Sequence, residues 1–287
     1  MHIGNIIFSD PRFIETPPAW IEHIPFAFFL IETLKPNVFV ELGTHYGNSY
    51  FAFCQAISEL KLKSRTFAVD RWTGDEHSGY YGIEVFEYVD RINNQNFSHF
   101  SNLLKMSFDD ANPYFNDGTI DLLHIDGTHN YEAVKHDFEM WLPKMSNKGI
   151  MILHDTKVYE TGFGVWKLME ELKNRYHSME FNHGNGLGII CTGNDVNTDF
   201  LHFIEKSNHD SFNANLFANL GEKLSLKLQT DFLLKELKRS REEQEQKNIE
   251  LTKNIKEMNQ IIMSRSWRLT MPLRYIMKII DLISRRF

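Results

Sequence analysis

The feature that most constrains the fold of this chain is an alternation that begins at Val38. Short apolar runs of strand length alternate with segments of helical periodicity, each about ten to fifteen residues long. This alternation predicts a Rossmann-like, doubly wound α/β fold, with a mostly parallel sheet, right-handed crossovers and helices on both faces. Strands are expected at VFVEL, TFAVD, LLKMS, IDLLHID, GIMILHD and LGIICT, with helices at about residues 23–34, 48–60, 85–93, 131–142 and 165–176.

Four of these strands carry an acid at or next to the carboxyl end. The four acids are Glu41, Asp70, Asp126 and Asp155. In open parallel sheets, ligands bind outside the carboxyl ends of the strands, so we expect the four acids on one functional edge. His124 lies inside its strand and is expected to be a hydrogen-bonded core residue.

The turn ELGTHYGNS, after the first strand, has the composition of a ligand-binding loop. Gly43 and Gly47 allow a tight turn and a close approach of the backbone to a ligand, and a helix N-terminus follows. The spacing differs from the dinucleotide motif G-x-G-x-x-G and from a P-loop. Asp70, some twenty residues further on, is placed to hold a ribose diol. Together these features point to an adenosine cofactor without a pyrophosphate, and S-adenosylmethionine fits.

The charge of the chain is unevenly distributed. The whole sequence has a formal charge of -7, which gives no indication of nucleic-acid binding. From Ser264 onward six basic residues stand against the single acid Asp281, so this end carries +5 and the remainder -12. A basic and apolar end on an acidic body indicates a docking or targeting function.

Cysteine content and hydropathy bear on the compartment. Two cysteines, Cys54 and Cys191, in 287 residues argue against a disulfide scaffold and for a reducing environment. The opening MHIGNIIFSDPRF lacks the features of a secretory signal, and no run reaches about 18 consecutive apolar residues. We expect a cytoplasmic protein, and contact with the inner membrane face stays open.

Residues 20–192 contain an ordered set of words: FVELGTHYGNSYFAFCQA, AVDRWTGDEHSGYYG, IDLLHIDGTHNYEAVKHDFEMWLPK, ILHDT, FGVWKLMEEL and HGNGLG. As a set they resemble the class I S-adenosylmethionine-dependent methyltransferases, in the branch with an IDGxHxY motif and a later HDT. That branch includes sugar O-methyltransferases of natural-product pathways. A closer resemblance is to methyltransferase domains of bacterial polysaccharide-synthesis proteins. The shorter word SRSWRLTMPLR resembles a segment that follows coiled coils in glycosyltransferases and methyltransferases of cell-surface glycans.

The resemblance implies cofactor roles for particular residues. Asp70 would take the ribose hydroxyls, and Asp126 would lie beside the sulfonium methyl and the acceptor hydroxyl. Ser107 and Phe108 are candidates for the adenine pocket. The residues expected at the methionine end of the cofactor are Glu41, Gly43, Gly47 and Ser49.

The resemblance also raises the question of a metal. In metal-dependent relatives, the acid that matches Asp126 and an acidic pair at the HD position hold a divalent ion. Here that pair is His154 and Asp155. Because Mg²⁺ prefers oxygen ligands and imidazole suits transition metals, dependence on Mg²⁺ or Mn²⁺ stays open.

The chemistry of methyl transfer to oxygen requires activation of the acceptor. An aliphatic hydroxyl is a poor nucleophile until a base removes its proton or a metal lowers its pKa. His129, three residues after Asp126, is the expected base, and Asp126 is expected to orient it or bind the metal. Lys135, His136 and Asp137 are expected on a solvated helix face. The residues expected to contact the acceptor are Trp72, Asp75, Glu76, His77, Tyr81 and His183.

The expected organisation has four parts. Residues 1–35 form an entry or lid segment, residues 36–200 the catalytic domain, residues 220–263 a coiled-coil helix and residues 264–287 a basic amphipathic tail. The long helix has a heptad seam with a polar middle, so a dimeric coiled coil and a solvated helix packed on its own domain both stay open. The tail suits either an anionic membrane surface or a partner protein such as a glycosyltransferase.

These features favour an S-adenosylmethionine-dependent O-methyltransferase. Its acceptor would be a sugar hydroxyl of a surface glycan, or of a nucleotide-linked or lipid-linked precursor. The alternative is a non-catalytic cofactor-binding scaffold whose coiled coil recruits polysaccharide-synthesis enzymes, and His154 keeps it open. A nicotinamide-dependent dehydrogenase is disfavoured because the G-x-G-x-x-G motif is absent.

Overall fold

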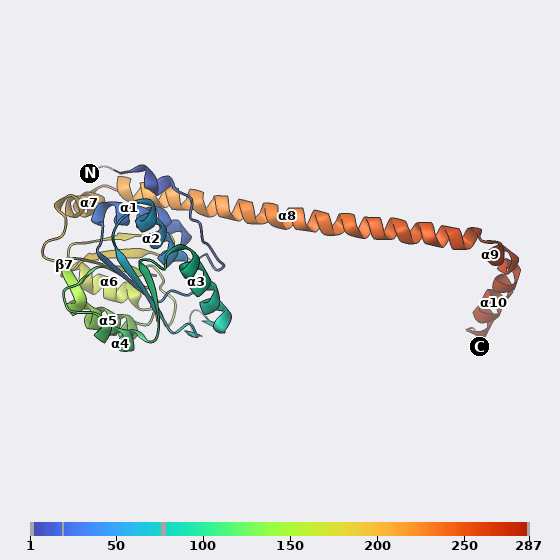
Figure 1. Ribbon diagram of the computed structural model, residues 1–287, viewed down its shortest axis with the longest axis horizontal. Helices are drawn as coiled ribbons and strands as arrows, with labels where there is room; N and C mark the ends of the chain where they lie inside the picture. Colours follow the sequence, from blue (N-terminus) through green and yellow to red (C-terminus); the bar gives the residue numbers. More distant parts are fainter. Residues whose placement is uncertain (1–2, 19, 76–78, 286–287) are drawn as a thin grey trace. The chain divides into compact units, whose positions relative to one another are not determined.

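The computed structural model of the chain describes residues 3–18, 20–75 and 79–285 (Figure 1). The chain divides into two compact units, Met1–Leu226 and Lys227–Phe287. The first unit contains the sheet, the helices that cover it and the start of the long helix α8 (Phe212–Met263). The second contains the rest of α8 and two short helices.

A seven-stranded sheet with the order β5-β2-β1-β6-β7-β9-β8 forms the centre of the first unit. The first five strands in this order are parallel, and β9 and β8 continue the sheet in antiparallel pairing. The expected mostly parallel, Rossmann-like fold is therefore confirmed. The strands are β1 (Val38–Leu42), β2 (Arg65–Asp70), β5 (Ser101–Lys105), β6 (Ile120–Ile125), β7 (Met145–His154), β8 (Ser178–Phe181) and β9 (Leu187–Cys191).

Helices cover both faces of the sheet, so every residue of the central strand β1 is buried. Val38, Val40 and Leu42 join the core formed with the helices α5 and α6. Phe39 points to the other face, where its ring packs 4.5 Å from that of Phe53 on α2. The helices of this unit are α1 (Ile24–Leu34), α2 (Asn48–Glu59), α3 (Ile83–Asn96), α4 (Phe108–Ala111), α5 (Tyr131–Trp141), α6 (Val165–Lys173) and α7 (Thr198–His209).

Several elements differ from the sequence expectation. The strand β5 begins two residues earlier than expected, and β7 begins at Met145 because Met145 pairs with Ile120 across an irregularity in the ladder. The helix α7 and the short pair β3 (Gly74–Asp75) and β4 (Gly79–Tyr80) were not expected.

The helix α8 also starts earlier than residue 220. Its first turns are fixed to the first unit, where the ring of Phe217 lies 5.1 Å from that of Phe26. A side chain at Gly221 would meet the backbone of Glu22, so this helical glycine permits a close contact. The start of the helix is therefore determined by tertiary packing, which the local sequence does not reveal.

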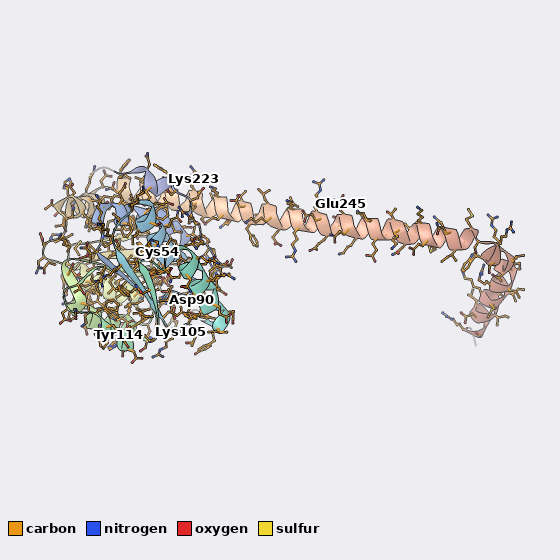
Figure 2. The ribbon with its side chains drawn as sticks, viewed as in Figure 1. Cys54, Asp90, Lys105, Tyr114, Lys223 and Glu245 are labelled. Atoms are coloured by element: carbon orange, nitrogen blue, oxygen red, sulfur yellow. The ribbon has the colours of Figure 1, made fainter. Side chains whose placement is uncertain are left out.

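The second unit is helical throughout its described part. It holds the remainder of α8, then α9 (Arg265–Leu269) and α10 (Met271–Ser284). Side chains such as Glu245 stand out from α8, whereas Cys54 is buried within the first unit (Figure 2). The apolar seam residues Leu234, Leu237 and Leu251 are exposed, and pairing through them stays a prediction. None of the helices among residues 3–18, 20–75 and 79–285 is both long and apolar enough to cross a membrane.

Candidate active site

The turn after β1 and the end of β6 meet at one backbone contact. The N–H of Asp126 donates to the carbonyl of Leu42 at 2.8 Å. Gly43 has a φ of +88°, and a Cβ at this position would lie 2.1 Å from the carbonyl oxygen of Asp126. Only glycine fits both the conformation and the space, so Gly43 lets the two strand ends approach each other.

Asp70, at the end of β2, fixes the same turn from the other side. Its Oδ2 accepts hydrogen bonds from the backbone N–H groups of Thr44 and His45, both at 2.9 Å. Its Oδ1 accepts a third from the N–H of Trp72 at 2.7 Å. A carboxylate has about four acceptor positions, so capacity remains for a hydroxyl donor.

These strand ends border a cavity of about 510 Å³, within the usual range of small-molecule sites. Seven of the expected site residues line it: Gly43, Asp70, Tyr81, Ser107, Phe108, Asp126 and His129. At Gly127 a Cβ would lie 2.5 Å from the ring of Phe108, so the glycine leaves the ring room beside the end of β6. Five further residues line the cavity without belonging to a motif that indicates a site: His45, Arg71, Thr73, Glu132 and Asp109.

The other expected site residues lie away from the cavity or are not described. Ser49 is buried, and Gly47 is the left-handed N-cap of α2. Trp72 is buried and donates its indole N–H to the carbonyl of His45 at 2.9 Å. His183 packs its ring 4.7 Å from that of His23. Glu76, His77 and the side chain of Asp75 lie outside the described residues.

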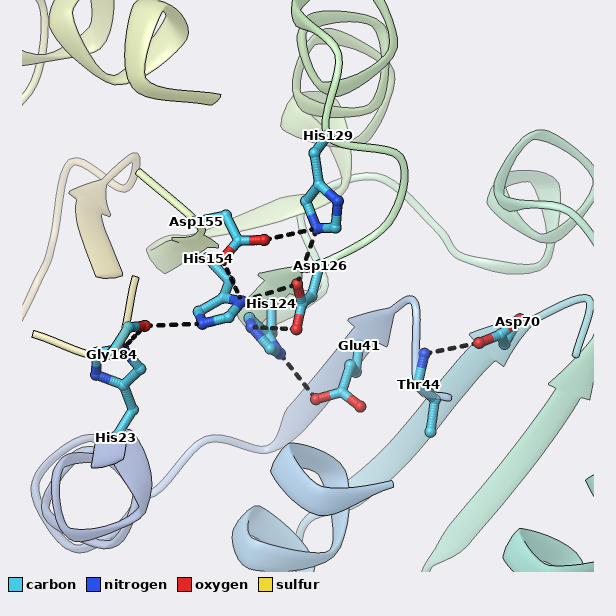
Figure 3. Close-up of polar contacts among 10 residues, drawn as sticks. All are labelled: His23, Glu41, Thr44, Asp70, His124, Asp126, His129, His154, Asp155 and Gly184. Carbon is cyan, nitrogen blue, oxygen red and sulfur yellow. Dashed lines mark hydrogen bonds and ion pairs between the residues drawn. The ribbon is translucent and has the colours of Figure 1, made fainter. Parts of the chain in front are cut away.

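Glu41 points into the protein and away from the cavity. Its Oε2 lies 2.8 Å from Nδ1 of His124, its register partner on β6, and both side chains are fully buried (Figure 3). Burial raises the pKa of Glu41, although the contacts with His124 and Ser49 oppose this. His124 is therefore a hydrogen-bonded core residue, as expected.

Asp126 is the centre of a cluster at the ends of β6 and β7 (Figure 3). Its Oδ1 lies 3.1 Å from Nδ1 of His154 and 3.4 Å from Nε2 of His129, and its Oδ2 lies 4.0 Å from Nε2 of His124. Burial opposes ionisation, but the charge of His154 and the hydrogen bonds of His129 and His154 hold the pKa of Asp126 well below its ordinary value. An ionised carboxylate therefore lies among three imidazoles.

His154 is oriented by a backbone carbonyl. Its Nε2 lies 3.2 Å from the oxygen of Gly184, and because a carbonyl only accepts, this nitrogen carries a proton. The other nitrogen, Nδ1, then faces Asp126 and Asp155. Burial lowers the pKa of His154, but these carboxylates outweigh it and raise the pKa to about 9.

The same carbonyl of Gly184 also accepts from Nε2 of His23 at 2.9 Å. His23 comes from the turn before α1 and is fully buried. Burial, with the nearby charge of His154, holds the pKa of His23 well below its ordinary value. The N-terminal segment thus reaches the histidine cluster through this shared oxygen and through ring contacts, since the ring of Trp20 lies 5.2 Å from that of His124 and the ring of His23 lies 5.6 Å from that of His154.

His129 belongs both to the cluster and to the wall of the cavity. Its Nε2 lies 3.1 Å from Oδ2 of Asp155 and 3.4 Å from Oδ1 of Asp126. Its ring stacks on Phe163, with centroids 5.2 Å apart. Burial lowers the pKa of His129, but the hydrogen bond and charge of Asp126 and the charge of Asp155 raise it above the ordinary value. His129 therefore holds a proton more firmly than a free imidazole does, at the wall of the cavity.

The residues Asp126, His154 and Asp155 fit a divalent metal ion. Each offers one ligand atom, and these atoms lie within 4.8 Å of one another. Asp155 has a φ of +60°, and its buried Oδ1 has no hydrogen-bond partner among the described residues. Two oxygens and one nitrogen suit Mn²⁺ or another transition ion better than Mg²⁺. A metal at Nδ1 would compete with the proton that His154 carries there.

A second cluster of one histidine and two carboxylates lines the cavity. Nε2 of His136 lies 3.1 Å from Oδ1 of Asp109, and both side chains are more than half exposed. Asp137 is only 6% exposed, so the expectation of a solvated face is wrong for this residue. Burial, with repulsion from Asp109, raises the pKa of Asp137 to about 7.

The domain region is similar to known methyltransferases. Residues 40–156 match a family model described as a methyltransferase domain. A relative from Sinorhizobium fredii, named "Uncharacterized protein y4gI", is 45% identical over 196 residues, which are 68% of this chain and 22% of the relative. This chain thus matches less than a quarter of that relative's length.

Solved structures with similar folds include two methyltransferases. The O-methyltransferase TomG from Streptomyces achromogenes, involved in tomaymycin synthesis and crystallised with S-adenosylmethionine, is 14% identical, with a TM-score of 0.46 over 63% of this chain and 82% of that chain. The S-adenosylhomocysteine-bound methyltransferase PaMTH1 from Podospora anserina is 13% identical, with a TM-score of 0.46 over 59% and 77%. The family match supports a methyltransferase domain over residues 40–156.

Proposed function

We propose that this chain is an S-adenosylmethionine-dependent O-methyltransferase that acts on a sugar hydroxyl of a surface glycan or its precursor. One observation carries the transfer reaction. Nε2 of His129 lies within 3.4 Å of both Asp126 and Asp155, at the wall of a cavity that Gly43 and Asp70 also line. A base and a site for an adenosine cofactor therefore share one cavity.

The residues around the cavity fit the cofactor. Asp70 keeps acceptor capacity for the ribose hydroxyls, and the ring of Phe108 offers a face for adenine. Gly43 and Gly127 leave space that a side chain would fill. When bound, S-adenosylmethionine supplies a methyl group on a sulfonium, which is a reactive electrophile.

The protein's contribution to the reaction is removal of the acceptor proton. To act as the base, His129 would need a neutral ring with its proton on Nδ1, so that Nε2 can accept the proton of the acceptor hydroxyl as the oxygen attacks; the new N–H would then donate to Asp126 or Asp155. Asp126 and Asp155 then stabilise the imidazolium, because both carboxylates face the same nitrogen. Phe163 fixes the plane of the ring by stacking on it.

A divalent ion at Asp126, His154 and Asp155 would serve the same step by a second route. It would lower the pKa of the acceptor hydroxyl and hold the oxygen beside the cavity. Gly184 supports this role because its carbonyl fixes the His154 tautomer that leaves Nδ1 directed at the two carboxylates.

The sugar acceptor is supported by the resemblance of residues 20–192 and of SRSWRLTMPLR to glycan-synthesis proteins. We expect the acceptor in the cavity beside His129, with Tyr81 on the same wall.

The decisive experiment is calorimetric titration of S-adenosylmethionine into the full chain, followed by methyl-transfer assays with glycan acceptors. We expect micromolar cofactor binding that Asp70→Asn weakens at least tenfold. The matched control Asp231→Asn, on the exposed part of α8, should bind like the unaltered chain. Absence of cofactor binding would overturn the proposal and favour the non-catalytic scaffold. Binding without transfer to any hydroxylated acceptor would overturn only the reaction.

A further inference from the structure

The last two helices form a compact corner. Ser264 caps α9 by accepting the N–H of Trp267 at 3.2 Å. The guanidinium of Arg274 lies 3.6 Å from the centre of the Trp267 ring and donates to Oγ1 of Thr270. These contacts join α9 to the first turn of α10, where Pro272 suits the helix start.

The charged residues of α10, together with Arg285 directly after it, gather in one narrow sector. At about 100° per residue, Arg274, Lys278, Asp281 and Arg285 fall within roughly 60° of the helix circumference. Within this sector, Asp281 pairs with Arg285 at 3.2 Å. Three cations against one acid leave the sector positively charged.

Most of the remaining circumference of α10 is apolar and exposed. The exposed fractions reach 64% at Leu273, 54% at Ile276 and 60% at Ile280. The other exposed apolar side chains of the helix are Met271, Tyr275, Met277, Ile279 and Leu282. An apolar stripe for one partner helix covers little more than about 100°, so this face is much wider than such a contact needs.

The length of α10 decides whether this helix could cross a membrane or would lie on its surface. Its 14 residues span about 21 Å, which is shorter than the roughly 30 Å hydrocarbon core. A short helix with a wide apolar face and a cationic sector lies in the plane of the interface, where the apolar side chains enter the acyl boundary and the cations contact head groups. Arg265 and Arg268 on α9 add positive charge directly before it.

We propose that α9 and α10 form an interfacial anchor that binds the surface of an anionic phospholipid bilayer. Charge complementarity selects the partner, since the described residues 264–285 carry five cations and one acid. The apolar face supplies the insertion, and the stacked Trp267 and Arg274 lie at the corner between the two helices. The anchor would bring the α/β unit to lipid-linked substrates.

The test uses the full chain and flotation with vesicles of phosphatidylcholine alone or mixed with phosphatidylglycerol. We expect binding to the anionic vesicles at least tenfold stronger than to the neutral ones, and weaker binding at high salt. Replacing both Arg274 and Lys278 with Gln should lower binding about 30-fold, from roughly fivefold per removed cation. The double substitution Ile276→Glu with Ile280→Glu should abolish it.

A matched control separates the anchor from other exposed apolar residues. Ile249→Glu introduces the same change on α8, outside the heptad seam, and should leave vesicle binding unaltered. Circular dichroism checks that the variants stay folded, and light scattering measures the oligomeric state. Equal binding to neutral and anionic vesicles, or no binding, would overturn the proposal. A third outcome would assign the face to self-association. In that case the unaltered chain does not bind vesicles, and the Ile276→Glu, Ile280→Glu variant has a lower oligomeric mass than the unaltered chain. None of these readouts depends on the proposed methyl transfer.

Discussion

Two clusters in this protein have the same composition and opposite electrostatics. One consists of Asp126, His154 and Asp155, and the other of Asp109, His136 and Asp137. In the first, opposite charges face each other at about 3 Å in a buried place, so the pKa of Asp126 falls and that of His154 rises. In the second, the ion pair is exposed, and the burial of Asp137 outweighs the charge of the nearby His136, so the pKa of Asp137 rises. Burial alone therefore does not fix the charge state of a cluster, because the position of the partner decides it.

The largest expected difference between the clusters is in catalysis. His129→Gln removes the proposed base beside the first cluster and should lower the methyl-transfer rate by about 10² to 10⁴-fold, while cofactor affinity stays within threefold. His136→Gln, the same change in the second cluster, should alter the rate less than threefold. Single-turnover assays and calorimetry measure the two quantities. Equal losses in both variants would remove the distinction between the clusters.

The second largest expected difference between the clusters is in their contribution to the free energy of unfolding. Asp126→Ala leaves the buried His154 with one carboxylate fewer, and we expect a loss of about 2–4 kcal/mol in the free energy of unfolding. Asp109→Ala breaks an exposed pair and should cost less than about 1 kcal/mol. Urea denaturation of both variants measures the difference, and similar losses would contradict it.

The pH dependence of stability tests the raised pKa of Asp137. The folded protein keeps the proton of Asp137 up to about pH 7, whereas the unfolded chain loses it near 3.8, its ordinary value. Between these values the folded state binds more protons, so the contribution of Asp137 to stability falls as the pH rises and is lowest above pH 7. Asp137→Asn should raise stability at pH 8 by about 1–3 kcal/mol, below the upper limit of roughly 4 kcal/mol for such a shift.

The measurement is urea denaturation of the unaltered chain and Asp137→Asn at pH 5 and pH 8. The advantage of the variant should be larger at pH 8 than at pH 5. An advantage that is equal at both values would show that Asp137 titrates normally.

Metal affinity gives the smallest expected difference. Asp155→Asn should weaken Mn²⁺ binding at least tenfold, because it removes the negative charge of a ligand whose backbone is held in place at a φ of +60°. Asp109→Asn should change it less than threefold, since its side chain is exposed and mobile ligands bind weakly. Calorimetry after removal of bound ions by a chelator measures both. Loss of Mn²⁺ binding in the second variant alone would move the metal site to the second cluster.

The sequence predicted the sheet well because burial leaves a direct signal in strand composition. The runs VFVEL and TFAVD lie in β1 and β2, and both strands end at the expected residues. The position of Asp70 at the sheet edge follows from these runs alone. The roles proposed for the site residues stay predictions.

Other features could not be predicted because they depend on contacts between segments that are distant in the sequence. Glu41 was expected at the cofactor, but its register places it opposite His124, and the two side chains bind each other in the interior. The contact between His23 and Gly184 joins residues 161 positions apart, so no local pattern encodes it. Asp137 did carry a signal, since Val134, Phe138 and Trp141 on the same helix define an apolar face that includes it.

The carbonyl of Gly184 links two imidazole rings that come from distant parts of the chain. A carbonyl oxygen has two lone pairs, and here His23 and His154 each donate one proton to it. If either ring flips, this oxygen loses one of its two donors, so the orientations of the two rings are coupled. A substitution of His23 in the N-terminal turn would therefore change how His154 is held, and with it the proton that His154 shares with Asp126.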